Sequence, residues 1–369
     1  MSRIVSIGTA NPEHRHSQDD ILGFMLEAHE GDAPTRSKIN AIYKRSNIDT
    51  RYSMMPDYSQ PEADRRFFPA GETELSLPGV SSRMKEFSSA AVPLSVKAIE
   101  SCLSRSGTGR EQVTHVIAVT CTGLSAPGLD LEIVKAMGLR NTIERTSLNF
   151  MGCYAAIHAL KHADYICRAD KKALVLVVCT ELCTLHFQRL KEDDHLIANS
   201  LFADGSAAVL VAGEEHEAAS RKGLSIKGFY SEIEREGEKD MAWNVSEKGF
   251  LMTLSTEVPR IIERSVAGLV ERALRALSLE KKEIGHWAMH PGGKRIVEAI
   301  SAKLQLTEEE QAPTWNVLRN YGNMSSAAIL FVLQEIWNST GWHNENIFCM
   351  ALGPGLTMET LVLTAVNAC

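Results

Sequence analysis

Residues 145–160, RTSLNFMGCYAAIHAL, contain a complete strand–turn–helix unit. The part SLNF (147–150) is strand-like, and Gly152 permits a sharp turn because a glycine has no Cβ. The small and apolar residues after Tyr154 recur with the spacing of a helix that buries one face. Units of this kind build layered α/β folds, in which helices cover the faces of buried sheets. The segment therefore predicts an α/β fold.

The same alternation of strands and helices extends outward over the whole chain. Runs rich in Val, Ile and Leu predict strands, and helix-period segments between them predict helices. The polar stretch 213–223, GEEHEAASRKG, is the best candidate for a boundary, and it divides the chain into an N-terminal half, 1–214, and a C-terminal half, 215–369. The predicted strands are 114–120, 173–178, 206–212, 224–230, 286–289, 347–352 and 360–366. The predicted helices are 90–104, 129–137, 154–169, 258–277, 293–304 and 324–338.

Composition excludes several classes of protein. The 369 residues suit about two domains, and 44% hydrophobic with 23% charged residues is ordinary globular composition. A net charge of −7 without a stripe of Lys and Arg argues against nucleic acid as a partner. We expect no transmembrane segment and no signal peptide, because the chain has no run of about 18 apolar residues and a polar N-terminus. These features predict a cytoplasmic protein.

The cysteines and histidines predict no metal site. The 8 cysteines form no CxxC pair and no Cys/His spacing typical of zinc. His158 and His162 are four residues apart but lack an accompanying carboxylate, so surface or core positions are the simpler interpretation. Most cysteines lie inside apolar runs and are expected to be buried thiols. Cys153 is the exception.

Cys153, His290 and Asn323 are the candidate catalytic residues. Cys153 precedes a helix, whose positive end favours the nucleophilic thiolate. His290, at the end of a predicted strand in HWAMHPGGKRI (286–296), can hydrogen-bond to a thioester oxygen or pair with a thiolate. Asn323, in RNYGNMSSAAI (319–329), can supply a second donor that does not titrate. Taken singly, each residue has a structural interpretation as packing, a turn or a helix cap. Papain-like proteases use the same three residue types on another fold.

The order of several motifs resembles the type III polyketide synthases, the chalcone-synthase family. They run from VSIGTANP (5–12) to GPGLTMETLVL (353–363) and so cover nearly the whole chain. NYGNMSSA after AMHPGGK is distinctive. The other motifs are NFMGCYAA (149–156), LFADGSAA (201–208) and ALGPGLTME (351–359).

The resemblance implies a thiolase-like fold, with two similar halves packed as αβαβα layers, and a homodimer. It implies that Cys153 takes an acyl group from coenzyme A and that His290 keeps this cysteine as a thiolate. His290 and Asn323 would then stabilise the enolate formed when malonyl-CoA loses CO₂. Acyl-CoA and malonyl-CoA are substrates in this scheme, and no tightly bound cofactor is expected.

The resemblance also assigns a binding site for coenzyme A, whose phosphates require cations. The segment KINAIYKRSNIDTRY (38–52) is similar to the family's basic stretch, and it has Lys38 and Arg45 at two of three cationic positions. Ala41 occupies the third position, and Arg295 is a candidate to compensate for it. Without the resemblance, such residues would be interpreted as solvated surface.

Differences from the plant chalcone synthases bear on the substrate. Trp243 stands where those enzymes have glycine, which removes space that a coumaroyl ring would need. Phe202 matches the gating phenylalanine, Met252 replaces a second one, and Leu352 replaces a phenylalanine of the GPG loop. Ala126 replaces a methionine that crosses the dimer interface. The residues expected to line the substrate cavity are Cys121, Thr122, Ala126, Cys183, His186, Phe202, Trp243, Met252 and Leu352.

A narrow apolar channel predicts a medium- or long-chain fatty acyl-CoA as the starter. Malonyl extension would then give an alkylpyrone or an alkylresorcinol, and the sequence leaves the ring type open. One alternative is an initiating β-ketoacyl carrier-protein synthase, for which Lys38, Lys44 and Arg45 would form the basic docking patch. The others are a chalcone or stilbene synthase-like enzyme with an aromatic starter, and an inactive thiolase-fold relative.

Overall fold

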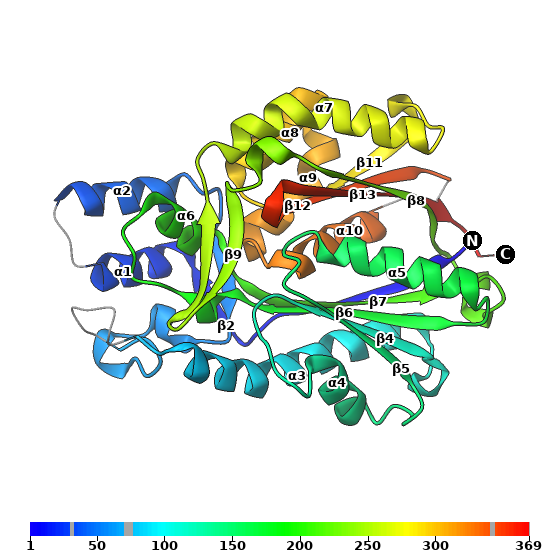
Figure 1. Cartoon of the computed structure of the whole chain (residues 1–369), viewed down its shortest axis with the longest axis horizontal. Coiled ribbons are helices and arrows are strands. Elements are labelled where there is room, and N and C mark those ends of the chain that lie inside the picture. The colour runs from blue at the N-terminus through cyan, green and yellow to red at the C-terminus, as the bar shows by residue number, and fades with distance from the viewer. Residues whose placement is uncertain (30–32, 70–76, 340–343, 369) are drawn as a thin grey trace.

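Nine strands form the centre of the fold in a computed structural model of the chain. The structure describes residues 1–29, 33–69, 77–339 and 344–368. The strand order is β11-β12-β13-β8-β1-β7-β6-β4-β5. Strands β1 and β8 pair through two residue pairs only, Arg3 with Ser225 and Ile4 with Leu224, so this link joins two stacked sheets (Figure 1). The N-terminal sheet comprises β1 (Arg3–Ala10), β7 (Asp204–Ala212), β6 (Leu174–Leu182), β4 (His115–Thr120) and β5 (Glu144–Asn149). The C-terminal sheet comprises β8 (Gly223–Ile233), β13 (Thr357–Val366), β12 (Asn346–Gly353) and β11 (Ile284–Met289).

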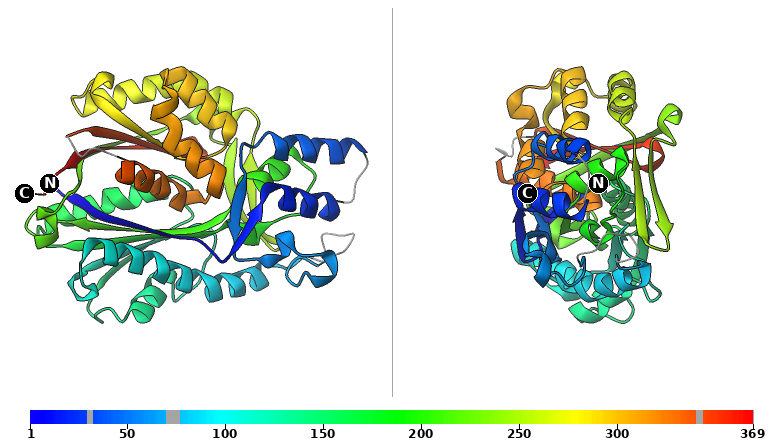
Figure 2. Two further views of the ribbon diagram at one scale, coloured as in Figure 1. Left: turned by 180° about the vertical axis from the view of Figure 1, so that it is seen from behind. Right: turned by 90° about the vertical axis from the view of Figure 1, so that its left-hand side faces the viewer.

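Helices fill three layers around the two sheets, and this confirms the predicted αβαβα order (Figures 1 and 2). Helices α5 (Ala155–Ala169) and α10 (Ala328–Ser339) lie between the sheets. Helices α3 (Val80–Ser106) and α4 (Leu129–Met137) cover the outer face of the N-terminal sheet. Helices α7 (Val258–Ala276) and α8 (Lys294–Leu304) cover the outer face of the C-terminal sheet, and α9 (Glu308–Tyr321) packs along its edge strand β11 and against α10.

The remaining elements gather at one end of the molecule, away from the two termini (Figure 2). Helices α1 (Gln18–Ala28), α2 (Ala33–Lys44) and α6 (Asp193–Leu201) pack there beside the short pair β2 (His14–Ser17) and β3 (Thr50–Ser53). The hairpin of β9 (Met241–Ser246) and β10 (Gly249–Leu254) borders the same end. The cavities described below lie between these elements and the two sheets.

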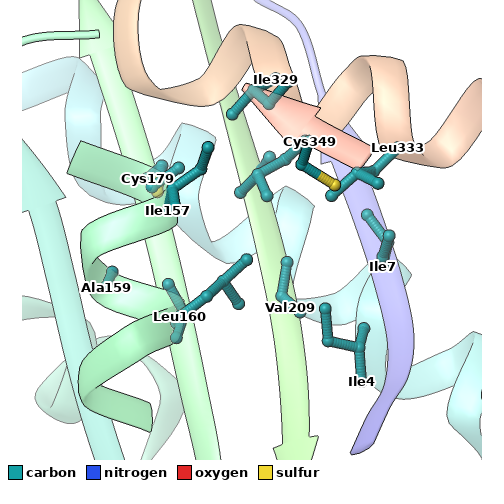
Figure 3. Packing of buried hydrophobic residues seen from close by; sticks show 14 of the residues in the cluster. Ile4, Ile7, Ile157, Ala159, Leu160, Cys179, Val209, Ile329, Leu333 and Cys349 are labelled. Carbon is teal, nitrogen blue, oxygen red and sulfur yellow. The ribbon is translucent and has the colours of Figure 1, made fainter. Parts of the chain in front are cut away.

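The central layer holds one of three hydrophobic clusters. Ile157 and Leu160 of α5 face Val209 of β7, and Ile329 and Leu333 of α10 complete the layer (Figure 3). All five side chains are at most 1% exposed, so the two sheets are held by close-packed aliphatic groups. All seven cysteines among the described residues are buried, as the apolar runs predict; Cys369 lies outside the described residues.

Every predicted strand and helix falls on an element of the same type, but several elements were not predicted. Strand β1, helices α1, α2, α6 and α9, and the β9–β10 hairpin have weaker patterns. Helix α3 begins at Val80, ten residues before the predicted start at residue 90. The prediction missed these first turns because they are polar and bury only Arg83 and Phe87. Helix α10 begins at Ala328 rather than Met324, because Ser325 has a positive φ of 48°. Within the described ranges, no helix is long and apolar enough to cross a membrane.

Candidate active site

Cys153 stands on a sharp turn between β5 and α5. Phe150 and Gly152 have φ values of 59° and 83°, which is the left-handed region. A Cβ on Gly152 would lie 2.2 Å from Cδ of Pro354, so only glycine fits there. The turn places Cys153 directly before the first turn of α5, where the sequence predicted it, with 7% of its surface exposed.

His290 and Asn323 reach the same place from the C-terminal half. His290 follows β11, and its backbone N–H donates to the carbonyl of Met350 on β12 over 2.8 Å. The Asn323 amide Nδ2 donates to the carbonyl of Gly292 over 3.3 Å, and Oδ1 accepts from the N–H of Ser325 over 2.9 Å. Asn323 therefore does not cap a helix: the N-cap of the short 3₁₀ turn before α10 is Met324, and the Asn323 side chain lies one residue before it.

The three residues line one cavity, which we call the triad cavity. Its empty volume is about 310 Å³, and Phe202, Met252 and Leu352 are part of its wall. Neither ring nitrogen of His290 has a hydrogen-bond partner among the described residues, although the side chain is buried. A buried imidazole without a partner is available to a bound molecule.

Burial opposes charge on both titratable members of this set. It raises the pKa of the Cys153 thiol to about 12, against the opposing effect of hydrogen bonds from Ser325 and Asn323. It lowers the pKa of His290 to about 3. Burial therefore favours a neutral thiol and a neutral imidazole in the resting pair, whereas the family resemblance implies a thiolate.

A hydrogen-bond network behind Cys153 was not predicted. Its Sγ lies 3.7 Å from Oγ of Ser325, which in turn lies 3.1 Å from Sγ of Cys121. Cys121 donates to Glu181 through its thiol over 3.2 Å and through its backbone N–H over 3.0 Å. Glu181 is fully buried, and burial raises its pKa. Glu181 is the one charged residue of the otherwise mostly apolar strand LVLVVCTEL (174–182), and this sequence feature could have indicated a buried polar network.

A second cavity, the inner cavity, shares Cys153, Phe202 and Met252 with the triad cavity. Its empty volume is about 320 Å³. The Trp243 indole N–H donates to the carbonyl of Cys121 over 2.6 Å, which fixes the ring in the wall. Of the residues predicted to line a substrate cavity, this one contains Cys121, Thr122, Cys183, Phe202, Trp243 and Met252.

A third cavity, the rear pocket, also has Trp243 in its wall and has an empty volume of about 440 Å³. It shares Cys183, Phe202, Trp243 and Met252 with the inner cavity. His186 belongs to its wall and stacks on Phe250 with ring centroids 4.2 Å apart.

Two predicted wall residues, His186 and Ala126, are absent from the two cavities that Cys153 lines. His186 is held by its neighbours, because Nδ1 accepts from the N–H of Phe250 over 3.1 Å and Nε2 donates to the carbonyl of Thr122 over 2.8 Å. Burial lowers the pKa of this histidine to about 3. Ala126 lies elsewhere, exposed on the loop between β4 and α4, because the chain leaves the sheet after Thr120.

The predicted cations line a larger outer pocket. Lys38, Arg45 and Arg295 all belong to its wall, and its empty volume is about 1100 Å³. Lys38 and Ala41 share one face of α2, which returns to the same side every three to four residues, and Arg45 directly follows the end of this helix at Lys44. The outer pocket shares Leu254, Gly292 and Ile296 with the triad cavity, so the two are adjacent.

Comparison with known proteins places the chain in a family. The family model of the chalcone and stilbene synthase N-terminal domain matches residues 1–215, and that of the C-terminal domain matches residues 229–367. The chain is 30% identical over 373 residues to the mycobacterial protein named alpha-pyrone synthesis polyketide synthase-like Pks18, covering 99% of this chain and 91% of that one.

Two Dictyostelium comparisons agree with this match. The chain is 29% identical over 373 residues to probable polyketide synthase 1 of Dictyostelium discoideum, across 99% of this chain but only 11% of that longer protein. The crystal structure of the type III polyketide synthase domain of Steely1, a type I/III hybrid, superposes with a TM-score of 0.90 at 28% identity and 99% coverage of both chains. The chain therefore belongs to the chalcone and stilbene synthase family and is a type III polyketide synthase, an acyltransferase that depends on malonyl-CoA.

Proposed function

We propose that this polyketide synthase condenses a medium- or long-chain fatty acyl-CoA with malonyl-CoA and releases an alkyl-α-pyrone. The observation that carries the proposal is the position of Cys153, His290 and Asn323 around one cavity, next to the outer pocket that Arg45 and Arg295 line. The membership in the chalcone and stilbene synthase family decides against the alternative of an initiating β-ketoacyl synthase.

The first step is acyl transfer to Cys153. Its sulfur attacks the thioester carbon of the starter while neutral His290 accepts the thiol proton. The bond between the acyl carbon and the sulfur of coenzyme A breaks, and the imidazolium returns the proton to that sulfur. Because both groups are neutral at rest, His290 acts here as a base during the attack.

The second step is decarboxylation of malonyl-CoA and condensation. Loss of CO₂ leaves an enolate, whose oxygen needs donors that do not protonate its carbon. The Asn323 amide donates to Gly292 and also hydrogen-bonds to Cys153 beside the reacting carbon, and the His290 ring has no partner among the described residues. The enolate carbon then attacks the Cys153 thioester, and the cysteine sulfur leaves.

The outer pocket is proposed to bind the phosphates of coenzyme A. Arg45 and Arg295 form no ion pair with the described residues, whereas Lys38 is paired with Asp193. An arginine without a carboxylate partner can bind a phosphate through two parallel hydrogen bonds. Arg295 thus supplies the charge that Ala41 lacks.

The fatty starter is inferred from the size and lining of the inner cavity. Trp243 restricts this cavity, and the sulfur and aromatic groups around it suit an alkyl chain, each buried CH₂ of which contributes about 0.8 kcal/mol. A pyrone needs only attack of an enol oxygen on the thioester. The mycobacterial relative, which is 30% identical, is named for alpha-pyrone synthesis, and this supports a pyrone product over a resorcinol.

A homodimer is part of the proposal. Strand β5 ends the sheet, pairs on one side with β4, and has five of its six residues exposed. An unpaired edge strand of this kind is a template for pairing with a second copy.

Mass spectrometry of products tests the proposal. Purified protein receives ¹³C-labelled malonyl-CoA with starters from acetyl-CoA to stearoyl-CoA and with coumaroyl-CoA, and Cys153→Ala is the control. Alkylpyrones from fatty starters that are absent with the variant are expected. Resorcinols would contradict the ring assignment, and products from coumaroyl-CoA alone would contradict the argument from Trp243.

A further inference from the structure

The rear pocket contains a buried arginine that the proposed chemistry does not use. Arg51 lies on β3 and belongs to the wall of this pocket, with only 3% of its surface exposed. Its Nε donates to Oε1 of Gln18 over 2.9 Å. Its Nη1 donates to the carbonyls of Asn199 and Phe202 over 2.8 and 2.7 Å. Its Nη2 is buried and has no hydrogen-bond partner among the described residues.

The charge of this guanidinium is also not paired. No carboxylate of the described residues lies within 4.0 Å of it, and the nearby buried Asp204 directs its oxygens elsewhere. Oδ1 of Asp204 accepts from the N–H of Thr184, and Oδ2 accepts from the Thr184 hydroxyl and the N–H of Met54. A buried cation with an open donor favours an oxygen that can accept from it, because a buried donor without a partner has lost its hydrogen bond to water and gained none in return.

The rear pocket is next to the nucleophile. It shares four wall residues with the inner cavity, which Cys153 also lines, so the two cavities adjoin at those side chains. Met252 is one of the four, and a methionine changes rotamer easily. A second polar group, the half-buried His195 of α6, lines the same pocket.

We propose that the rear pocket is a subsite for oxygen and that Arg51 is a specificity-determining residue. Its ligand is a ketone or carboxylate oxygen of the acyl chain held on Cys153. A plain alkyl chain in this pocket would leave the guanidinium without a partner, whereas an oxygen would accept from Nη2. The inference rests on the proposed function, because it assumes an acyl group on Cys153.

The test compares how fast three acyl-CoA thioesters of equal chain length acylate Cys153, followed by mass spectrometry of the intact protein. Octanoyl-CoA has no further oxygen, 3-oxooctanoyl-CoA has a ketone close to the thioester, and suberoyl-CoA has a distal carboxylate. Arg51→Met removes the guanidinium but also the bonds that hold the Phe202 carbonyl. Ala198→Met is therefore the decisive variant, because it fills the rear pocket and leaves Arg51 intact.

The control is Ala90→Met, which adds the same side chain at a separate surface pocket lined by residues of α3 and the β1–β2 loop. With Ala198→Met and Arg51→Met, we expect the rate for at least one oxygenated thioester to fall about 10-fold relative to octanoyl-CoA. The oxygenated thioester whose acylation rate falls shows whether the pocket binds a ketone or a carboxylate oxygen. Equal losses for all three thioesters, or the largest loss for octanoyl-CoA, would overturn the subsite alone. Absence of acylation in the wild-type protein would overturn both the subsite and the proposed function.

Discussion

Cys153 and His290 share a cavity in which burial shifts the pKa of each residue away from its charged form. Burial raises the pKa of Cys153 to about 12, so thiolate is scarce at pH 7 and becomes more abundant with every rise in pH. We predict that the rate of Cys153 alkylation by iodoacetamide increases continuously from pH 6 to about pH 10. Peptide mass spectrometry measures this rate for each cysteine separately.

The matched variant is His290→Gln, which keeps a polar side chain but cannot accept the proton. We expect the same rise with pH, because the resting thiol does not depend on an imidazolium. A wild-type rate that levels off near pH 7, with loss of the plateau in His290→Gln, would instead establish a resting ion pair.

Gly152 is the residue on which the position of Cys153 depends. Alanine at Gly152 would adopt a φ of 83° and place its Cβ 2.2 Å from Pro354. Gly138 is a matched control, because its φ is 59° but its Cβ would meet only the end of the Arg110 side chain at 3.8 Å. Both substitutions should lower the free energy of unfolding by about 1 kcal/mol from the backbone alone.

We predict that Gly152→Ala lowers this free energy by a further ~1–3 kcal/mol and abolishes acylation of Cys153. Gly138→Ala should keep full acylation. Urea unfolding and intact-protein mass spectrometry measure the two effects. Equal stability of the two variants would show that Pro354 moves aside and that the turn does not require glycine.

The candidate triad could be predicted from the sequence because each member lies in a motif at the end of an element. Their common cavity could not, since it depends on the packing of the two halves. Ser325 and Glu181 were missed for a similar reason, because contacts between distant segments give them their role. Arg51 lay in the basic segment at 38–52 and was indistinguishable there from a surface arginine.

At the scale of elements, the pattern of each segment determined what could be predicted. Strands buried on both faces, such as β6 and β7, contain continuous apolar runs, and these runs predicted both strands. The end of β6 was predicted four residues too early, because Thr180 and Glu181 interrupt the apolar pattern there. Strand β5 has a polar sequence, Glu144–Asn149, and was predicted only in part. In the single chain its side chains are exposed, which fits a strand whose second partner is another copy of the chain.

Strand β5 therefore provides a test of the proposed dimer. We predict that Thr146→Lys weakens the dimer at least about 10-fold, because the two copies would place like charges close together across the shared edge. Thr146 is exposed, so the fold of the single chain should be unchanged. Light scattering after size exclusion distinguishes the chain mass of 40.6 kDa from twice this mass.

The control for this substitution is Ser104→Lys, which adds the same charge at an exposed position of α3. It should leave the dimer intact. Dissociation by both variants would point to net charge as the cause, and a wild-type protein that is monomeric would exclude the dimer.

At the scale of the whole molecule, the outer pocket exists only because the two halves meet. Helix α2 contributes Lys38, and the segment after it contributes Arg45, whereas Arg295 comes from the first turn of α8 in the other half. The basic segment alone predicted a binding site with one cation missing. The packing of α8 against this side supplies the replacement, which the sequence indicated only through the resemblance.

The three cations of the outer pocket should differ in their importance for coenzyme A. Arg45 and Arg295 form no ion pair with the described residues, so their charge is available to phosphates, whereas Lys38 is engaged by Asp193. We predict that Arg45→Ala and Arg295→Ala each raise KM for malonyl-CoA roughly 10-fold, equivalent to ~1.4 kcal/mol. Lys38→Ala should change KM less than about threefold, because an exposed ion pair contributes only about 0–1 kcal/mol.

Malonyl-pantetheine, which lacks the nucleotide and its phosphates, is the control substrate, and its KM should be the same for all three variants and the wild-type protein. If the arginine variants impair malonyl-pantetheine as much as malonyl-CoA, the outer pocket shapes the cavity and does not bind the phosphates.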